Sequence, residues 1–496
     1  MADSKAKGLN PGDADMIVGE THSIGNEGTR ASDGAPIDGK SDIEDLSSIF
    51  RANDIRGIAD VYLTADNVYR IGQAIGSEAD DRGEQTIIVA ADGRVSSPAT
   101  VESLIKGLRE SGRDVMDIGI VPTPVLYFAT RTLDYSSGVM VTASHNPSAY
   151  NGFKIVLQGK TLDESGIQKL YARFQKREFA VGDGKLEQSD IIDEYIDRIC
   201  DDVTMAQPMR IVVDCGNGVA GNIAPDLFSK LGCEVIALHC EVDGTFPNHD
   251  PDPTVPGNLD ELIRVVQSSN ADLGIAFDGD GDRLVVVSGE GNIIWPDQLL
   301  MLFARNIVSQ HPGCDIVYDV KCTRHLSSVI SRYGGKPTVC RSGHSFMKAK
   351  LAETGALLAG EMSGHICFNE RWYGFDDGLY SAARLLEIVG SSKTSLQELM
   401  SEFPVSVSTP EIRIPIDEQE KFGLISQLVE KADFGDGNIS TLDGIRVDYA
   451  DGWGLVRASN TAPELTMRFE ADDEKSLSRI RGIFKREILS IRKLDL

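Results

Sequence analysis

The sequence predicts an α/β chain of several domains built on parallel or mixed sheets. From about residue 45 onward, short apolar runs of the length of buried strands alternate with amphipathic stretches of helical period. Three of these runs end alike and lead through a loop into a helix-like stretch: TIIVAAD at 86–92, RIVVDCGNG at 210–218 and CDIVYDV at 314–320. The recurrence predicts one α/β unit used three times, and 496 residues allow three or four domains.

The chain begins with a segment, residues 1–44, that is rich in Gly, Asp, Ser and Ala. Such a segment buries too little apolar surface to offset the entropy of ordering, so we expect a disordered acidic tail. The domains that follow are placed at 45–189, 190–291, 292–404 and 405–496. In the last of them, strands with glycine turns at 441–460 precede a helix around 474–489, which predicts an α+β domain.

Charge and cysteine usage argue against several classes of function. The formal charge of -27 repels nucleic acid and anionic membranes, and an anionic ligand must find a local basic patch. The eight cysteines are scattered singly, so we expect buried thiols rather than a zinc site or a disulfide framework. No stretch reaches the roughly 18 apolar residues of a membrane span, and the N-terminus has no apolar leader. We therefore expect a cytoplasmic protein that binds neither nucleic acid nor membrane.

The segment GVMVTASHNPSAYNGFKI places Ser144 in a proline-bounded turn at the carboxyl end of a predicted strand. Open α/β sheets bind their ligands at that edge. Taken alone, Ser144 and His145 are also consistent with an ordinary hydrogen-bonded turn. A serine hydrolase is poorly supported, because there is no G-x-S-x-G elbow and a histidine directly after the serine need not be its base. This motif alone leaves the function open.

The segment LGIAFDGDGDRLVVV sets Asp278, Asp280 and Asp282 at alternate positions between two apolar strands. Crowded carboxylates repel one another unless a cation joins them, and ligation by oxygen alone selects a hard ion such as Mg²⁺. An EF-hand is excluded because its sixth position must be Gly and is Arg283, and its twelfth must be Glu and is Gly289. A solvated acidic turn is disfavoured because the flanking apolar runs bring the loop out of a sheet. The pattern predicts a divalent-metal site.

The segment LLAGEMSGHICF alternates Glu361, Ser363 and His365 in a loop bounded by glycines. If the segment is extended, the three side chains point to one side. A carboxylate and a hydroxyl suit binding to sugar hydroxyls, and a histidine there can pass protons near neutral pH. On its own, a histidine between Gly364 and Ile366 is more often a structural group than a catalyst.

The segment GLVRASNTAPELTMRFE carries a polar cluster after a predicted strand, made of Arg457, Ser459, Asn460 and Thr461. Arginine offers a planar fork to phosphate, and hydroxyls, an amide and loop N–H groups can complete a cradle. The alternative is an ordinary polar turn. In a chain this acidic, an arginine among small neutral donors favours an anion site.

Together the four loops supply a nucleophilic hydroxyl, a metal triad, a clamp for sugar hydroxyls and a phosphate cradle. Phosphoryl transfer needs such a set, because its catalysis is mostly in-line positioning and neutralisation of charge on the moving group. Further basic residues are candidates for the local positive patch: Arg56, Lys154, Arg283, Lys321 and His344.

From about residue 47 to the C-terminus the chain resembles the α-D-phosphohexomutase superfamily, and within it the bacterial bifunctional phosphomannomutase/phosphoglucomutases. FRANDIRG, TASHNP, NGFK, DGDGDR, DVKCTR, SGHS, GEMSGH, RWYGFDDG and RASNT occur in the family's order. The resemblance implies four domains around a central cleft, the first three with a shared mixed-sheet α/β core and the fourth α+β. It also implies an isomerase that acts on small phosphosugars, usually as a monomer.

The resemblance further implies a phosphate carried on Ser144. One Mg²⁺ per chain would be held by a phosphoserine oxygen and three carboxylates: Asp278, Asp280 and Asp282. Two side chains would lie beside the phosphoserine, His145 and Arg283. Three are candidates for proton transfer: Arg56, Lys154 and His365.

The implied substrate contacts come from the third and fourth domains. Lys321, Gly343 and His344 would face the sugar, and Glu361 with Ser363 would grip its 3- and 4-hydroxyls. The non-reacting phosphate would be held by Arg457, Ser459, Asn460 and Thr461. Glucose and mannose differ at C2, away from these groups, so the resemblance implies that both are used.

In the implied cycle, phospho-Ser144 donates to one sugar hydroxyl, and the hexose 1,6-bisphosphate, which also acts as activator, turns over and returns its other phosphate. The chain departs from close relatives at Asn53, where the motif often has tyrosine, and we expect altered substrate affinity there. Three alternatives stay open: a phosphoglucosamine mutase, whose clamp commonly reads GEQSGH where this chain has Met362; a metal-dependent phosphatase, which usually has an aspartate nucleophile; and a non-catalytic sugar-phosphate sensor.

Overall fold

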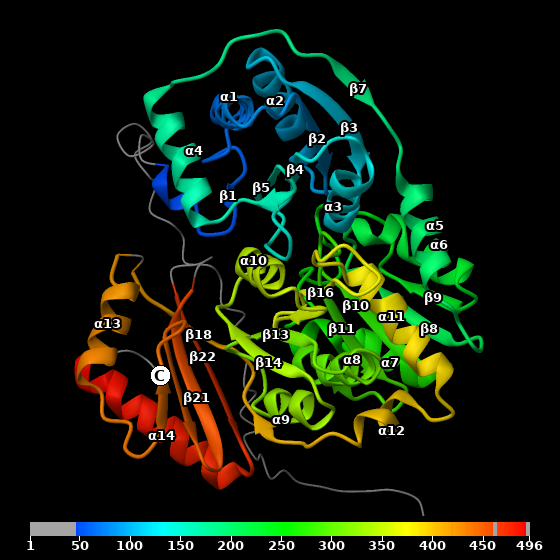
Figure 1. Ribbon diagram of the computed structural model, residues 1–496, viewed down its shortest axis with the longest axis vertical. Coiled ribbons are helices and arrows are strands. Elements are labelled where there is room, and N and C mark those ends of the chain that lie inside the picture. Colours follow the sequence, from blue (N-terminus) through cyan, green and yellow to red (C-terminus); the bar gives the residue numbers. More distant parts are fainter. Residues whose placement is uncertain (1–45, 418, 460–463, 493–496) are drawn as a thin grey trace, which may run out of the picture. The chain divides into compact units, whose positions relative to one another are not determined.

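The computed structural model describes residues 46–417, 419–459 and 464–492, and the chain from Leu46 onward forms one compact unit. Within this described part, the strands form four sheets that follow one another along the sequence (Figure 1). An α/β chain with mixed sheets, as the sequence predicts, is confirmed. The acidic tail that we predicted at 1–44 lies outside the described residues.

The first sheet is mixed. Its strands are β1 (Ile55–Ile58), β2 (Thr86–Ala91), β3 (Asp114–Ile120), β4 (Gly138–Val141), β5 (Tyr150–Leu157), β6 (Lys160–Thr161) and β7 (Leu186–Gln188). Its helices are η1 (Ser47–Ile49), α1 (Ala65–Asp81), α2 (Ser97–Glu110), α3 (Thr123–Thr132) and α4 (Glu164–Lys176). The order is β1-β5-β4-β2-β3-β7 with β6 beside β5. Strand β5 is antiparallel to its neighbours, while β4, β2, β3 and β7 run parallel to one another.

Side chains of β2 alternate between two apolar layers, as the two-residue period of a strand requires. Ile87 and Val89 belong to the core that includes α1, α2 and α4. Ile88 and Ala90 point the other way and pack in the core that includes α3. That second core continues into the second and third sheets, so the α3 face joins the first sheet to the rest of the molecule.

The second and third sheets are smaller. The second has strands β8 (Arg210–Asp214), β9 (Glu234–Leu238), β10 (Leu273–Phe277), β11 (Leu284–Ser288) and β12 (Ile293–Ile294), with helices α5 (Ile192–Asp202), η2 (Val219–Asn222), α6 (Ala224–Lys230), η3 (Pro256–Leu259) and α7 (Asp260–Ser269). The third has strands β13 (Asp315–Asp319), β14 (Lys336–Cys340), β15 (Leu358–Gly360) and β16 (Ile366–Phe368), with helices α8 (Pro296–Gln310), α9 (His325–Arg332), α10 (His344–Thr354), α11 (Gly378–Ser391) and α12 (Leu396–Met400).

One strand order recurs in these three sheets, which confirms the predicted repeated unit. The order is β5-β4-β2-β3 in the first, β11-β10-β8-β9 in the second and β16-β15-β13-β14 in the third. In each unit the first strand is antiparallel and the other three are parallel. The hairpin at the antiparallel end carries Ser144 in the first unit, the aspartate triad in the second and the loop with Glu361 in the third. The fold therefore sets three of the predicted functional loops at equivalent positions.

The fourth sheet is antiparallel and has its own core, as expected for an α+β domain. Its strands are β17 (Val407–Ser408), β18 (Ile412–Pro415), β19 (Asn438–Ser440), β20 (Ile445–Tyr449), β21 (Gly452–Ala458) and β22 (Glu464–Ala471), with helices α13 (Lys421–Lys431) and α14 (Glu474–Ile491). The domain is tied to the third sheet through Trp453, which packs against Val320, and through Arg446, which donates to Val320 O at 2.7 Å.

The eight cysteines are free thiols, as the sequence predicts, but not all of them are buried. Cys200, Cys240 and Cys314 are only partly buried, which corrects that expectation. Among the helices of the described residues, none combines the length and apolar character that crossing a bilayer requires.

Candidate active site

A cavity of about 670 Å³ is lined by residues that follow or join the strands of all four sheets, together with strand residues of the first and fourth sheets. Ser144 comes from the first unit, Arg283 from the second, Glu361 from the third and Arg457 from the fourth. The cavity thus opens where the equivalent hairpin loops of the three repeated units meet the fourth domain, and it can enclose a molecule of the size of a phosphosugar.

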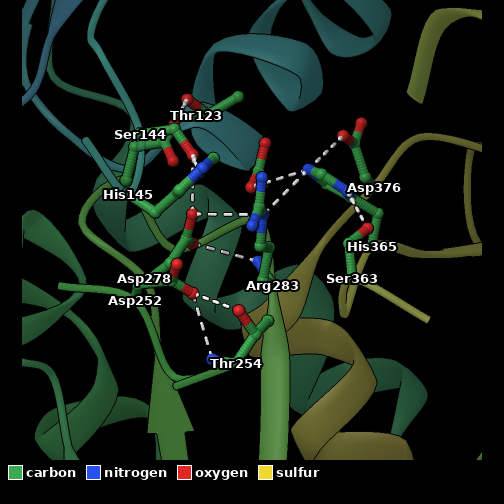
Figure 2. A network of polar contacts seen from close by, with 12 residues as sticks. Thr123, Ser144, His145, Asp252, Thr254, Asp278, Arg283, Ser363, His365 and Asp376 are labelled. Carbon is green, nitrogen blue, oxygen red and sulfur yellow. Dashed lines mark hydrogen bonds and ion pairs between the residues drawn. The ribbon is translucent and has the colours of Figure 1, made fainter. Parts of the chain in front are cut away.

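The turn after β4 holds Ser144 in a left-handed backbone conformation, with φ of 50°. Non-glycine residues seldom adopt this conformation, and they do so preferentially at functional sites. Ser144 Oγ donates to Asp278 Oδ2 at 2.7 Å, and its N–H donates to Thr142 Oγ1 at 2.8 Å. The hydroxyl is therefore fixed against the acidic loop of the second unit (Figure 2).

The Ser144 turn is held from behind by Arg94, which is 1% exposed. Its guanidinium donates to the carbonyl oxygens of Ser144 at 2.6 Å, Asn146 at 2.7 Å and Pro147 at 2.7 Å. Asp92 pairs with it at 3.0 Å and keeps the fork in one orientation. We did not predict this anchor from the sequence, although an Asp-Gly-Arg run directly after a buried strand is a visible signal.

The three predicted metal ligands, Asp278, Asp280 and Asp282, are fully buried, and one oxygen of each lies within 4.8 Å of the others. Within the described residues, Oδ1 of Asp280 has no hydrogen-bond partner. Burial, followed by the charges of Asp282 and Asp280, raises the pKa of Asp278 to about 8. Crowded buried carboxylates stay ionised only beside a cation, so this all-oxygen set fits a hard divalent ion.

Glycines allow the acidic loop to approach the Ser144 turn. A Cβ on Gly279 would come within 2.5 Å of Ser144 O, and Gly281 has a φ of 75°. The alternation of aspartate and glycine in the sequence is therefore a packing requirement as well as a ligand pattern.

Lys154 on β5 brings a positive charge of the chain itself to the triad. Its Nζ donates to Asp280 Oδ2 at 2.6 Å and also pairs with Asp282. Burial opposes the charge on Lys154, but the two aspartates outweigh it and raise its pKa. Thr123, at the start of α3, donates both its hydroxyl and its N–H to Asp280. We did not predict Thr123 from the sequence; its signal there is its place after β3, at the carboxyl edge of the sheet.

The loop between β15 and β16 is a tight turn, which corrects the extended geometry that we expected. The Gly364 N–H donates to Glu361 O at 3.1 Å. The predicted side chains nevertheless meet, since Ser363 Oγ lies 3.2 Å from Glu361 Oε2 and 3.1 Å from His365 Nδ1. His365 Nδ1 also lies 2.9 Å from Glu361 Oε2, and its Nε2 lies 3.3 Å from Asp282 Oδ1. Burial opposes the charge on His365, but Asp282 and Glu361 outweigh it and raise its pKa to about 9.

Asp376 joins His344 and His365 in the same polar network. Its Oδ1 accepts from Lys348 Nζ at 2.8 Å, and its Oδ2 lies 3.8 Å from His344 Nδ1 and 3.9 Å from His365 Nε2. Burial, with the neighbouring Lys348, lowers the pKa of His344 well below its usual value. The sequence singled out RWYGFDDG but gave Asp376 no role, so this residue was missed.

Arg56 on β1 reaches the Ser144 turn from the first sheet. It pairs with Asp54 and donates to Ala143 O at 3.1 Å and to Asn146 Oδ1 at 2.6 Å. These contacts place a guanidinium on the cavity side of the turn, where both Arg56 and Ser144 line the wall.

His145 lies beside the Ser144 hydroxyl, and Arg283 lies near Asp278, the carboxylate that accepts from this hydroxyl. His145 Nδ1 is 3.3 Å from Ser144 Oγ, and Arg283 Nε is 3.6 Å from Asp278 Oδ2 and 3.4 Å from His365 Nε2. Burial, with the charge of Arg283, lowers the pKa of His145 well below its usual value. Figure 2 shows Arg283 between the acidic loop and His365.

Asn53 links the first unit to the third. Its Oδ1 accepts a hydrogen bond from Ser345 Oγ, and a Cβ on Gly343 would come within 3.1 Å of the Asn53 amide. The Gly343 N–H in turn donates to Glu361. Asn53 therefore supports the segment at the start of α10 that we predicted to face the sugar.

On the far wall of the cavity, Lys321 Nζ lies 3.1 Å from Glu411 Oε2, and Arg457 Nε lies 3.0 Å from Asp443 Oδ2. Ser459 is buried and lines the cavity beside them. Glu411 and Asp443 carry no motif in the sequence and were missed. Two residues of the predicted phosphate cradle lie outside the described part of the chain: Asn460 and Thr461.

The basic residues predicted to form a positive patch do line the cavity or its floor, but each is already beside a carboxylate. Four of them form ion pairs: Arg56 with Asp54, Lys154 with Asp280, Arg283 with Asp278 and Lys321 with Glu411. His344 lies 3.8 Å from Asp376, but its lowered pKa leaves it neutral at neutral pH. The predicted positive patch thus consists of four cations around the cavity, each of them paired with a carboxylate.

Family models match the chain over most of its length. All four describe phosphoglucomutase/phosphomannomutase domains: alpha/beta/alpha domain I at 47–181, domain II at 193–291, domain III at 295–406 and the C-terminal domain at 411–486.

Individual proteins agree with these models. The chain is 57% identical over 445 residues to a phosphomannomutase/phosphoglucomutase of Pseudomonas aeruginosa, covering 90% of this chain and 96% of the relative. A probable phosphoglucosamine mutase of Methanopyrus kandleri is 34% identical over 467 residues, covering 88% of this chain and 97% of the relative. A solved phosphoglucomutase/phosphomannomutase family protein of Burkholderia thailandensis superposes with a TM-score of 0.86 at 47% identity, covering 90% and 99% of the two chains.

Proposed function

The chain belongs to the phosphoglucomutase/phosphomannomutase family, and we propose that it interconverts hexose 1-phosphates and hexose 6-phosphates by phosphoryl transfer through Ser144. One observation carries this proposal: Ser144 Oγ, in a strained turn, lies 2.7 Å from Asp278 of a buried carboxylate triad at the wall of a sugar-sized cavity. Mannose and glucose phosphates are the proposed substrates, in keeping with the name of the Pseudomonas relative.

In the proposed cycle, the phosphate on Ser144 passes to a hydroxyl of the bound hexose monophosphate. The O–P bond to Ser144 breaks, a new O–P bond to the sugar forms, and the sugar hydroxyl gives up its proton. The resulting hexose 1,6-bisphosphate turns over and returns its other phosphate to Ser144. The same bisphosphate serves as activator, since it phosphorylates an enzyme that has lost its phosphate.

Proton transfer requires a group that can hold a proton near the reacting oxygen. His365 is one candidate, because carboxylate oxygens of Glu361 and Asp282 lie 2.9 and 3.3 Å from its two ring nitrogens and favour the protonated ring, which can donate. His145, whose pKa is lowered, is neutral at the same pH and can accept. Arg56 and Lys154 are fixed by ion pairs, which favours orientation and charge neutralisation as their part in the transfer.

Asp278, Asp280 and Asp282 are the residues that would hold Mg²⁺, one ion per chain. When bound, such an ion neutralises charge on the transferring phosphoryl group. The chain's own contribution is to bury the three carboxylates and to fix Asp278 against the Ser144 hydroxyl.

Residues of the third and fourth domains are proposed to orient the substrate. Glu361 and Ser363 are proposed to bind the hydroxyls at C3 and C4, which exchange places when the sugar turns. Arg457 and Ser459 are proposed to bind the phosphate that does not react. Lys321, which the resemblance places at the sugar, lines the same part of the cavity close enough to feel the charge of Arg457, and we propose that it contacts this phosphate as well. Because the cavity is lined by residues of one chain, the proposed unit of function is a monomer.

The mechanism is tested by replacing Ser144 with alanine. Ser144→Ala should lose nearly all mutase turnover, even with glucose 1,6-bisphosphate supplied, while its circular dichroism and melting temperature stay close to those of the wild type. Near-normal turnover in this variant would contradict a phosphate carried on Ser144.

Substrate class is tested by a coupled assay with three sugars. We expect comparable rates with mannose 1-phosphate and glucose 1-phosphate, and little activity with glucosamine 1-phosphate. A preference for the glucosamine compound would favour the phosphoglucosamine mutase alternative, whose Methanopyrus relative is the more distant match.

A further inference from the structure

Glu411, just before β18, lies in the cavity wall among three cations. Its Oε2 is 3.1 Å from Lys321 Nζ and its Oε1 is 3.6 Å from Arg413 Nε. Burial would raise the pKa of Glu411, but Lys321, Arg413 and Arg457 outweigh it and hold the pKa at about 2. Glu411 is therefore fully ionised at neutral pH.

Two of these cations, Lys321 and Arg457, are those proposed above to bind the substrate's phosphate. A phosphate dianion at this wall has to share Lys321 with a carboxylate that already occupies it. Two anions competing for one ammonium repel each other, and water only partly screens this repulsion because the Glu411 side chain is 21% exposed. This wall therefore binds phosphate less tightly than the same cations would without the charge of Glu411.

We propose that Glu411 acts as an internal counter-anion, which competes with the substrate's phosphate for Lys321 and prevents the phosphosugar from binding too tightly to turn over in the cavity. The inference rests on the proposed function, because only a mutase that reorients its intermediate gains from weak binding of the non-reacting phosphate.

The physical reason lies in the cycle. Binding that is equally strong in the ground state and the transition state lowers KM without raising kcat. In a mutase such binding also slows the reorientation, since each charge-assisted contact to the phosphate must break before the bisphosphate can turn. A carboxylate that competes for Lys321 weakens binding of the phosphate in the ground state. It therefore speeds the reorientation, for which the phosphate must leave Lys321.

Glu411 is suited to this role in a way that Asp443 is not. Asp443 Oδ2 is held by both Arg457 at 3.0 Å and the Ser342 N–H at 3.0 Å, so it is fixed between two donors. The Glu411 side chain is 21% exposed and lines the cavity, and its second ion pair, at 3.6 Å, is to Arg413, whose side chain is 47% exposed. It can therefore yield Lys321 to an incoming phosphate.

The test is Glu411→Gln, which keeps the shape of the side chain and removes its charge. The variant should bind inorganic phosphate and glucose 1-phosphate about tenfold more tightly, as expected when one nearby like charge is removed from a partly screened site. In the coupled assay its KM for glucose 1-phosphate should fall by a similar factor, and its kcat should fall as well. Glu411→Asp, which keeps the charge, should return both constants toward wild-type values.

Direct binding separates this inference from the proposed function. Calorimetry with glucose 1-phosphate on Ser144→Ala and on the Ser144→Ala, Glu411→Gln double variant measures affinity without turnover. Glu420→Gln is the control, because it removes the same charge from the fourth domain at an exposed pair with Arg492. Unchanged or weaker binding in the Glu411→Gln background would overturn the inference, even if the wild type is an active mutase. Absence of mutase activity in the wild type would instead overturn the proposed function.

Discussion

Replacement of Arg94 by methionine should release the Ser144 turn while leaving the rest of the first sheet folded. The guanidinium is 1% exposed and donates to the carbonyl oxygens of Ser144, Asn146, Pro147 and Tyr150 at 2.6 to 3.1 Å. Methionine has a similar length and supplies none of these donors, so the four acceptors and Asp92 lose a partner together.

The expected loss of stability in Arg94→Met follows from the burial of the ion pair between Arg94 and Asp92. Breaking a buried ion pair by removing one partner costs about 3–5 kcal/mol, and the lost carbonyl bonds keep the value toward the upper part of that range. A loss of about 4 kcal/mol in the free energy of local opening corresponds to about a thousandfold faster hydrogen exchange at the protected amides. The amides to follow are those of Asn146 and Tyr150, which donate within the turn to Ala143 O and Pro147 O.

Hydrogen exchange read by mass spectrometry on peptides that cover 142–151 is the assay, with peptides from the fourth domain as internal reference. Arg70→Met is the matched control, because Arg70 pairs with Asp66 on the exposed face of α1 and its loss should cost about 0.5 kcal/mol or less. Turnover should fall at least about a hundredfold in Arg94→Met, since a displaced Ser144 no longer meets Asp278. Unchanged exchange in 142–151, or turnover within twofold of the wild type, would refute the anchoring role of Arg94.

Three further predictions concern the metal, the sugar-facing loop and pH. Removal of Mg²⁺ with a chelator should lower the melting temperature, measured by calorimetry. Mg²⁺ at 100 times its Kd should restore about 2.7 kcal/mol of unfolding free energy. An unchanged melting temperature would contradict a triad that needs a cation. Asn53→Ala removes the acceptor for Ser345 and should raise KM for glucose 1-phosphate about three- to tenfold with kcat little changed, so a collapse of kcat instead would show a catalytic role. The pKa of Glu411 is lowered from 4.5 to about 2, so its ion pairs stabilise the fold above about pH 4.5 and are lost as the pH falls toward 2; the difference in melting temperature between wild type and Glu411→Gln should shrink on acidification.

The sequence predicted those parts of the site that are contiguous in the chain. Ser144, the aspartate triad and the Glu361 loop each lie in one hairpin, where a strand, a few glycines and the functional side chains are read together. The fold class followed for the same reason, since strand and helix periods are local properties.

The residues that were missed reach the site only through tertiary folding. Thr123 is 157 residues from Asp280, Glu411 is 90 residues from Lys321, and Arg94 is 50 residues from Ser144. Thr123 and Glu411 have no motif around them, and Arg94 has only the short Asp-Gly-Arg run after β2. A threonine, a glutamate or an arginine at such a position is common in any α/β chain. The turn at Glu361 was misjudged because Gly364 allows a φ of 100° that alternation of polar residues does not reveal.

The pairing of four predicted cations with carboxylates explains how a chain of charge -27 can bind a phosphosugar. An open cluster of bare cations would be costly to assemble in a folded wall, because like charges a few ångströms apart repel. Carboxylates such as Glu411 and Asp54 remove that cost in the free protein. A phosphate dianion carries more charge than one carboxylate, so it can replace Glu411 at Lys321, whereas a neutral sugar cannot. Recognition of the phosphate is then the exchange of a carboxylate for an anion of higher charge. The carboxylates therefore contribute to the selectivity for phosphorylated sugars as much as the cations with which they pair.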